Sequence, residues 1–172
     1  MDAEKIKTER WELLWATQRS QRYHSRRTSF FGRWNKLTAF TGVIGGSAVF
    51  ASVGNQMPWL ATIGAAAVVV ISGADLVIGT SEMSRMHNDL RRRFCELEAA
   101  IVSTVTTTES DIAKWKAQRI AIESDEPPTH VALNLLCDNE LSRSYGHLSG
   151  HQEHAVPWYK KLTAHFLIWE DA

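Results

Sequence analysis

The chain has 172 residues with 19 basic and 19 acidic side chains, so its length fits one domain and its balanced charge gives no overall signal for a polyanionic partner. The charged residues are distributed unevenly, because none occurs from Leu37 to Ala74 while both flanks carry many. This apolar block is informative in a way that the bulk composition is not, and it predicts an all-α membrane protein.

Residues 1–36 are expected to form a cytoplasmic N-terminal helix, since they contain no proline and a single glycine, Gly32. Two stripes recur at helical spacing along this segment. One stripe should pack against the rest of the protein, and the other should carry positive charge. The first contains Trp11, Leu14, Trp15 and Gln18, and the second Arg19, Arg22, Arg26 and Arg33.

Residues 37–79 are predicted to form a transmembrane hairpin, because the apolar block is about two spans long. Gly54, Asn55, Gln56, Met57 and Pro58 interrupt it with a flexible residue, two amides and a helix-stopping proline. The expected spans are 37–53 and 59–79. A soluble protein with a buried hairpin is the alternative, and it is disfavoured because the sequence offers no second apolar layer to cover these helices.

Basic residues flank both outer ends of the hairpin and are absent from its turn, which predicts that both termini are cytoplasmic. Aromatic residues near the two faces are typical of interfacial anchors. The lipid bilayer is therefore an expected partner. Residues expected to contact lipid headgroups are Arg22, Tyr23, His24, Arg26, Arg27, Trp34 and Trp59.

Small residues at four-residue spacing occur in both spans, as Gly42 with Gly46 and Ala61 with Ala65. This spacing lets membrane helices approach closely. It predicts helix packing either within the hairpin or between copies of the chain.

Asp75 is expected about one turn inside the cytoplasmic end of the second span, where a carboxylate requires a partner. It should lie level with Lys36. Two interpretations follow: an ion pair with Lys36 or Arg33, or a ring of Asp75 side chains at the mouth of a pore formed by several copies.

Residues 80–126 are predicted to form a long cytoplasmic amphipathic helix, with a kink or break in the threonine-rich stretch from Ser103 to Ser110. Its apolar stripe is a candidate seam between copies in a homo-oligomer, in the manner of a coiled coil. The seam consists of Leu90, Phe94, Leu97, Ile101 and Val105.

Residues 129–172 are expected to hold cytoplasmic or interfacial helices. Val131 to Tyr145 shows one apolar face that ends at Gly146, and Pro157 occupies the favoured first turn of a last helix. Trp158 and Lys160 are typical of a helix in the headgroup layer. Docking on the cytoplasmic helices is the alternative.

No pattern of catalytic or cofactor-binding residues is recognisable, so the chain is not expected to be an enzyme or to need a cofactor. His147, His151, His154 and Cys137 are the one group that resembles metal ligands, but their spacing matches no zinc signature and no metal site is predicted. Cys95 and Cys137 should be reduced thiols.

The stretch Arg22-Tyr23-His24-Ser25-Arg26-Arg27, followed by Phe30-Phe31 and Arg33-Trp34-Asn35-Lys36-Leu37, leads directly into the two predicted spans. From Trp11 to Val105 this arrangement resembles the SLATT-type effector family of bacterial conflict, or anti-phage, systems. The end, from Val156 to Leu162, is similar to the closing segment of relatives in mobile elements.

The resemblance implies a two-span effector of the bacterial inner membrane that oligomerises into a pore and disrupts the membrane when a nucleotide-signalling or sensing partner, encoded separately, activates it. The alternative is a non-conducting membrane adaptor, scaffold or prophage exclusion protein that recruits a partner through its cytoplasmic helices. A holin-like protein is disfavoured by the large cytoplasmic portion. Nucleic-acid binding is not expected, because topology and anionic headgroups already explain the basic stripe.

Overall fold

The computed structural model describes residues 2–45, 47, 57–146 and 150–169. These residues form helices and no strand, which confirms the all-α class. The chain divides into two compact units, described separately below. Unit 1 comprises Met1–Arg26 and His87–Ala172, and unit 2 comprises Arg27–Met86.

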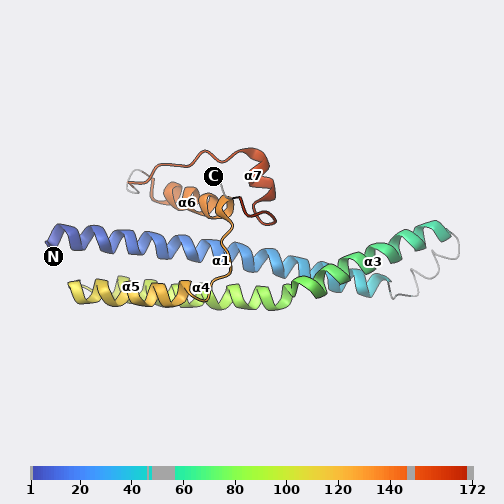
Figure 1. Ribbon diagram of the computed structural model, residues 1–172, viewed down its shortest axis with the longest axis horizontal. Coiled ribbons are helices and arrows are strands. Elements are labelled where there is room, and N and C mark those ends of the chain that lie inside the picture. Colours follow the sequence, from blue (N-terminus) through green and yellow to red (C-terminus); the bar gives the residue numbers. More distant parts are fainter. Residues whose placement is uncertain (1, 46, 48–56, 147–149, 170–172) are drawn as a thin grey trace. The chain divides into compact units, whose positions relative to one another are not determined.

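Figure 1 shows the helices in chain order. They are α1 (Ala3–Gly45), α3 (Pro58–Ile78), α4 (Thr80–Ser103), α5 (Glu109–Glu123), α6 (Val131–Tyr145) and α7 (Trp158–Thr163). The helix α1 continues without interruption from the charged N-terminal segment into the apolar block, as its composition predicts.

The long helix expected over residues 80–126 is two helices, with the break in the threonine-rich stretch. Thr108 begins α5 with a capping box, because its side chain accepts a hydrogen bond from the backbone of Asp111 and the Asp111 carboxylate accepts one from the backbone of Thr108. The Thr108 hydroxyl also donates to the Asp111 carboxylate at 2.7 Å, and this bond together with the one from the Thr108 backbone lowers the pKa of Asp111. The cap makes a new helix start more favourable than continuation of α4.

The core of unit 1 forms between the N-terminal part of α1 and the part of α4 that follows His87. On α4 the buried side chains alternate at spacings of three and four, and they meet a matching row on α1. The α4 row is His87, Leu90, Phe94, Leu97 and Ile101, and the α1 row includes Leu13, Thr17 and His24.

This packing corrects the predicted oligomer seam. Leu90, Phe94, Leu97 and Ile101 are at most 3 % exposed within a single chain, so they are not available to another copy. Val105, the fifth predicted member, is 94 % exposed because it follows the end of α4. The stripe was recognised correctly, but its partner is α1 of the same chain.

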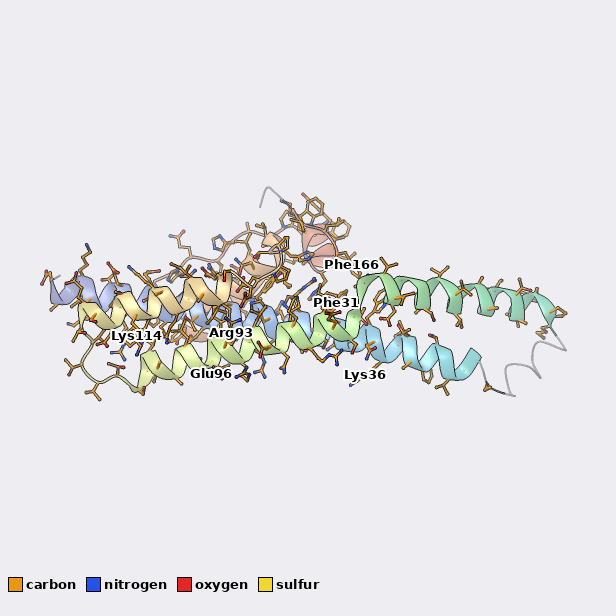
Figure 2. All side chains as sticks on the ribbon, turned by 60° about the horizontal axis from the view of Figure 1, so that its bottom comes forward. Phe31, Lys36, Arg93, Glu96, Lys114 and Phe166 are labelled. Carbon is orange, nitrogen blue, oxygen red and sulfur yellow. The ribbon has the colours of Figure 1, made fainter. Side chains whose placement is uncertain are left out.

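Polar side chains join the helices of unit 1 around this core. Arg10 donates to the carbonyl of Ile101 at 2.9 Å, and Gln18 donates to Glu98 at 2.6 Å, which sets α1 and α4 antiparallel. Arg93 pairs with Asp125 at 2.6 Å and holds the end of α5 beside α4 (Figure 2).

The helix α6 and the C-terminal segment pack on the other side of α1. Tyr23, Ala132, Leu133, Cys137 and Ala164 form one buried cluster, with Leu136 and Trp169 packed against it. The Tyr23 hydroxyl accepts a hydrogen bond from the backbone of His130 at 3.1 Å. Docking of the C-terminal segment on the helices, one of the two predicted alternatives, is therefore observed for the side that carries Ala164.

Unit 2 pairs the C-terminal part of α1 with α3 and the start of α4. The helices approach closely at Gly45, where an added Cβ atom would lie 3.1 Å from Cγ2 of Val68. Near the start of the α1 part of this unit, Phe31 is buried and the guanidinium of Arg27 lies over its ring, 4.5 Å from the centroid. Ser84 donates to the carbonyl of Thr28 at 3.2 Å and fixes α4 against α1.

Candidate functional site

The first candidate site is the apolar helix pair of unit 2. Among the described helices, α3 alone is long and apolar enough to cross a membrane, and none of its residues is buried. Its 21 residues extend about 31 Å at the rise of an α-helix, close to the thickness of a hydrocarbon core. The observed bounds agree with the predicted span 59–79 to within one residue.

The first predicted span, 37–53, lies only partly within the described residues. The helix α1 covers its first half and ends at Gly45, whereas residues 46 and 48–53 are outside the described part of the chain. Among the described residues, α3 thus has the length and composition of a membrane span, and the span over 37–53 stays a prediction.

The small residues of the two helices face different ways. Gly45 meets Val68 inside the pair, while Cβ atoms added at Gly42 or Gly73 would meet nothing within 4 Å. Ala65 is exposed and Ala61 is half-buried. Of the predicted packing residues, Gly42 and Ala65 thus point outward, and Gly46 lies outside the described residues. The contact that closes the pair uses Gly45, which the four-residue pattern did not single out.

Asp75 lies one turn before the end of α3 and accepts a hydrogen bond from the hydroxyl of Thr80. Gly79, with φ 64° and ψ 50°, ends the helix in the left-handed conformation and allows its N–H to bond the carbonyl of Asp75 at 2.8 Å. Within the described residues no ion pair joins Asp75 to Lys36 or Arg33, both of which are exposed. A single chain therefore gives Asp75 a hydroxyl partner in place of the expected cation.

The expected headgroup contacts require a correction at Tyr23 and His24, which are 4 % and 0 % exposed and belong to the core of unit 1. Arg26 and Arg22 pair with Glu140 at 2.7 and 3.6 Å. Of the remaining residues, Arg27 is buried against Phe31, Trp34 is half-buried and Trp59, at the start of α3, is exposed. Trp59 keeps the exposure that an interfacial anchor needs.

A buried polar cluster occupies the end of the unit 1 core. Nδ1 of His24 and Nδ1 of His87 are 2.9 Å apart, and Nε2 of His24 is 3.1 Å from Oε1 of Glu126. The ring of Phe94 stacks on His24 with an interplanar angle of 16°. Since only one of two facing nitrogens can carry the hydrogen in such a bond, one ring donates its Nδ1–H and the other accepts it. His87 continues the three-and-four spacing of the α4 stripe, which was the sequence signal for its burial.

A second polar cluster centres on Asp138, a buried residue of α6. Its carboxylate accepts a hydrogen bond from Trp15 Nε1 at 2.8 Å and lies 3.1 Å from His154 Nε2, with Arg19 at 3.7 Å. His151 stacks on Trp15 with ring centroids 3.8 Å apart. These side chains line a groove of about 680 Å³ between α1, α5 and α6.

The residues that resembled metal ligands are dispersed by these contacts. His151 is stacked, His154 faces Asp138, and His147 lies outside the described residues. Burial raises the pKa of the Cys137 thiol to about 12, so it stays protonated at neutral pH and is a poor ligand. Within the described residues no group of three or more His, Cys, Asp or Glu side chains has a geometry that could hold a metal ion.

Comparison of the chain with protein-family profiles, with curated proteins and with solved structures finds no match. The fold therefore defines only the class of the protein. Its described residues form helices, unit 1 is held together by polar side-chain contacts around a core, and α3 has the length and composition of a helix that crosses a bilayer.

Proposed function

We propose that the protein is an oligomeric effector of the bacterial inner membrane, with both termini in the cytoplasm, that makes the membrane permeable when a defence or conflict system activates it. The observation that carries the proposal is the uncovered apolar surface of unit 2, where Ile63, Val69 and Val77 are 60 %, 71 % and 87 % exposed. Such a surface is stable only against lipid or against further apolar helices.

Two helices cannot enclose an aqueous path, so permeation requires several copies around an axis. With the α4 stripe occupied inside the chain, the outward small residues are the better candidate for assembly, since Gly42 and Ala65 lie open on the two helices. The hydroxyls of Thr38 and Thr62 donate to carbonyls four residues earlier, at 3.2 and 3.0 Å. Their polar groups are satisfied within each helix, which favours a hydrophobic, gated constriction over an open channel.

The test is membrane potential and viability after high-level induced expression in bacteria, which drives assembly by mass action without the activating partner, with membrane levels matched between variants. Gly42→Leu should reduce depolarisation, because it adds bulk where nothing within the chain is displaced. Val43→Leu is the matched control, since it changes a neighbouring side chain that is 74 % exposed without filling a small-residue surface. Equal effects of the two variants, or polarised cells despite abundant membrane-inserted protein, would contradict the proposal.

Asp75→Asn separates the two interpretations of this residue. Asparagine keeps an oxygen that can accept the Thr80 hydrogen bond, so folding should be unchanged while the charge is lost. If Asp75 lines a pore mouth, the variant should shift the selectivity between cations and anions. Unaltered selectivity in a conducting protein would leave Asp75 with the local role of accepting from Thr80.

A membrane adaptor is the second candidate function, and the groove beside Asp138 is the observation that favours it. This groove combines Trp15 and Ile120 with the charged Arg19 and Glu12, a mixture that suits contact with a partner. An adaptor would leave membrane potential unaffected. Ile120→Glu, at a groove position that is 65 % exposed, would then abolish its activity by loss of the partner, whereas Gly42→Leu would not.

A further inference from the structure

The C-terminal segment 155–169 carries an apolar face that the rest of unit 1 does not cover. Trp158, Leu162 and Phe166 follow one another at spacings of four and are 76 %, 73 % and 61 % exposed. Phe166 and Leu167 continue the turn of α7, because their N–H groups bond the carbonyl of Thr163 at 2.9 and 3.0 Å. The three side chains therefore share one side of a helical stretch, part of which is shown in Figure 2 with Phe166 labelled.

The opposite side of this segment is firmly attached to unit 1. Ala164 is 1 % exposed in the cluster with Tyr23 and Cys137, and the carbonyl of Leu167 lies 3.1 Å from Nδ1 of His130. Trp169 donates to the hydroxyl of Thr163 at 3.2 Å. Contacts on the opposite side of the segment therefore hold the apolar face towards solvent.

The charged side chains of residues 155–169 are two lysines of α7, and Glu170 and Asp171 follow this stretch. Lys161 is exposed, whereas Lys160 is half-buried with its ammonium 5.4 Å from the centroid of the Trp169 ring. Tyr159 is 44 % exposed beside them. Aromatic rings with a polar edge, an aliphatic side chain and the exposed ammonium group of Lys161 are a combination found in helices that lie in the headgroup layer of anionic membranes.

We propose that this C-terminal face, composed of Trp158, Tyr159, Leu162 and Phe166 with Lys161, docks on the headgroup layer of an anionic lipid bilayer. The inference rests on the membrane association in the proposed function and is independent of pore formation. The chain that carries α3 keeps this face at a high local concentration of lipid. The positive charge favours an anionic lipid surface over a second copy of the same face, which would bring like charges together.

Anionic lipid should strengthen this docking by roughly fivefold for each lysine near the surface. Lys161→Gln should therefore weaken it by roughly fivefold, and added salt should weaken the wild-type contact in the same direction. Leu162→Glu, at a position that makes no buried contact, should abolish the docking without disturbing the Ala164 side of the segment.

The experiment uses the full chain in vesicles, with Cys95→Ala and an environment-sensitive fluorophore on Leu162→Cys. Cys137 stays unlabelled because it is buried and protonated. In vesicles of phosphatidylcholine and phosphatidylglycerol the label should be blue-shifted and quenched by nitroxide lipids. Both effects should decline in phosphatidylcholine alone and in Lys161→Gln. A label on Ile120→Cys of α5, where the native side chain is 65 % exposed, should stay in water.

Three results would overturn the inference, and each has a distinct meaning. A water-exposed Leu162→Cys label on protein that resists alkaline extraction would leave membrane association intact and refute docking. A blue-shifted label that nitroxide lipids do not quench, with energy transfer between the labels of two copies, would assign the face to a protein contact. Loss of the whole chain from the vesicles on alkaline extraction would refute the proposed function together with this inference.

Discussion

Replacement of Phe94 by alanine is expected to destabilise unit 1 strongly, because the side chain is 0 % exposed and stacks on His24 with centroids 5.6 Å apart. Truncation of a fully buried phenylalanine costs about 3–5 kcal/mol. In a domain of about 100 residues each kcal/mol lowers Tm by about 4–8 °C, so the fall should be at least ~12 °C. Val105→Ala, at a position 94 % exposed in the same predicted stripe, should change stability by less than about 0.5 kcal/mol.

The assay is thermal unfolding of the full chain in mild detergent, followed by near-ultraviolet circular dichroism at two protein concentrations. Since Phe94 packs within one chain, the loss of stability should not depend on concentration. An unchanged Tm for Phe94→Ala, accompanied by a weaker association between copies, would refute the assignment of this stripe to the core of unit 1 and restore it as an oligomer seam.

Three further predictions concern single residues. Maleimide should label Cys95 but not Cys137 in the folded protein. Because the folded pKa of Cys137 is raised to about 12, the protonated thiol contributes its full stability below the unfolded pKa, and the free energy of unfolding should fall as pH rises from there towards 12. This pH dependence should be absent in Cys137→Ala. Gly79→Ala should cost about 1–2 kcal/mol in thermal unfolding because φ is +64°, whereas Gly73→Ala, in an open helical position, should be neutral or stabilising. Thr108→Ala should cost about 1 kcal/mol by loss of the α5 cap; an unchanged denaturation midpoint would exclude the cap as the reason that α5 starts there.

The helical class and the bounds of α3 were predictable because they depend on the composition of a contiguous segment and on local stop signals. The block without charge locates α3, Pro58 begins it and Gly79 ends it. The break after Ser103 was likewise indicated by threonines of low helix propensity. Each of these signals is contained in one contiguous stretch of the sequence.

The partners of the apolar stripes could not be predicted in the same way. A row of residues such as Leu90 and Phe94 shows that a helix packs, but spacing alone does not distinguish a neighbour in the same chain from another copy. His24 was assigned to lipid headgroups because of its place beside the spans, yet tertiary packing buries it together with His87. The rule that would have found them is their register with the buried apolar row on each helix.

The site predictions divide along the same line. Asp75 was correctly expected to need a partner, but Thr80, which follows it by five residues, supplies a hydroxyl from the next helix. The metal-like group failed to assemble because Asp138 and Trp15 engage His154 and His151 from α6 and α1. Contacts between distant segments decide such clusters, and no spacing rule in one sequence encodes them.

Ion flux through vesicles that contain the purified full chain tests the central proposal most directly. We expect flux that rises more steeply than linearly with protein density, because assembly of several copies is required, and that Gly42→Leu reduces while Val43→Leu does not. Flux that is absent at every density, with the protein integral to the membrane and folded, would contradict a pore and favour the adaptor function. Flux proportional to density and indifferent to Gly42→Leu would contradict assembly through the open small-residue surface.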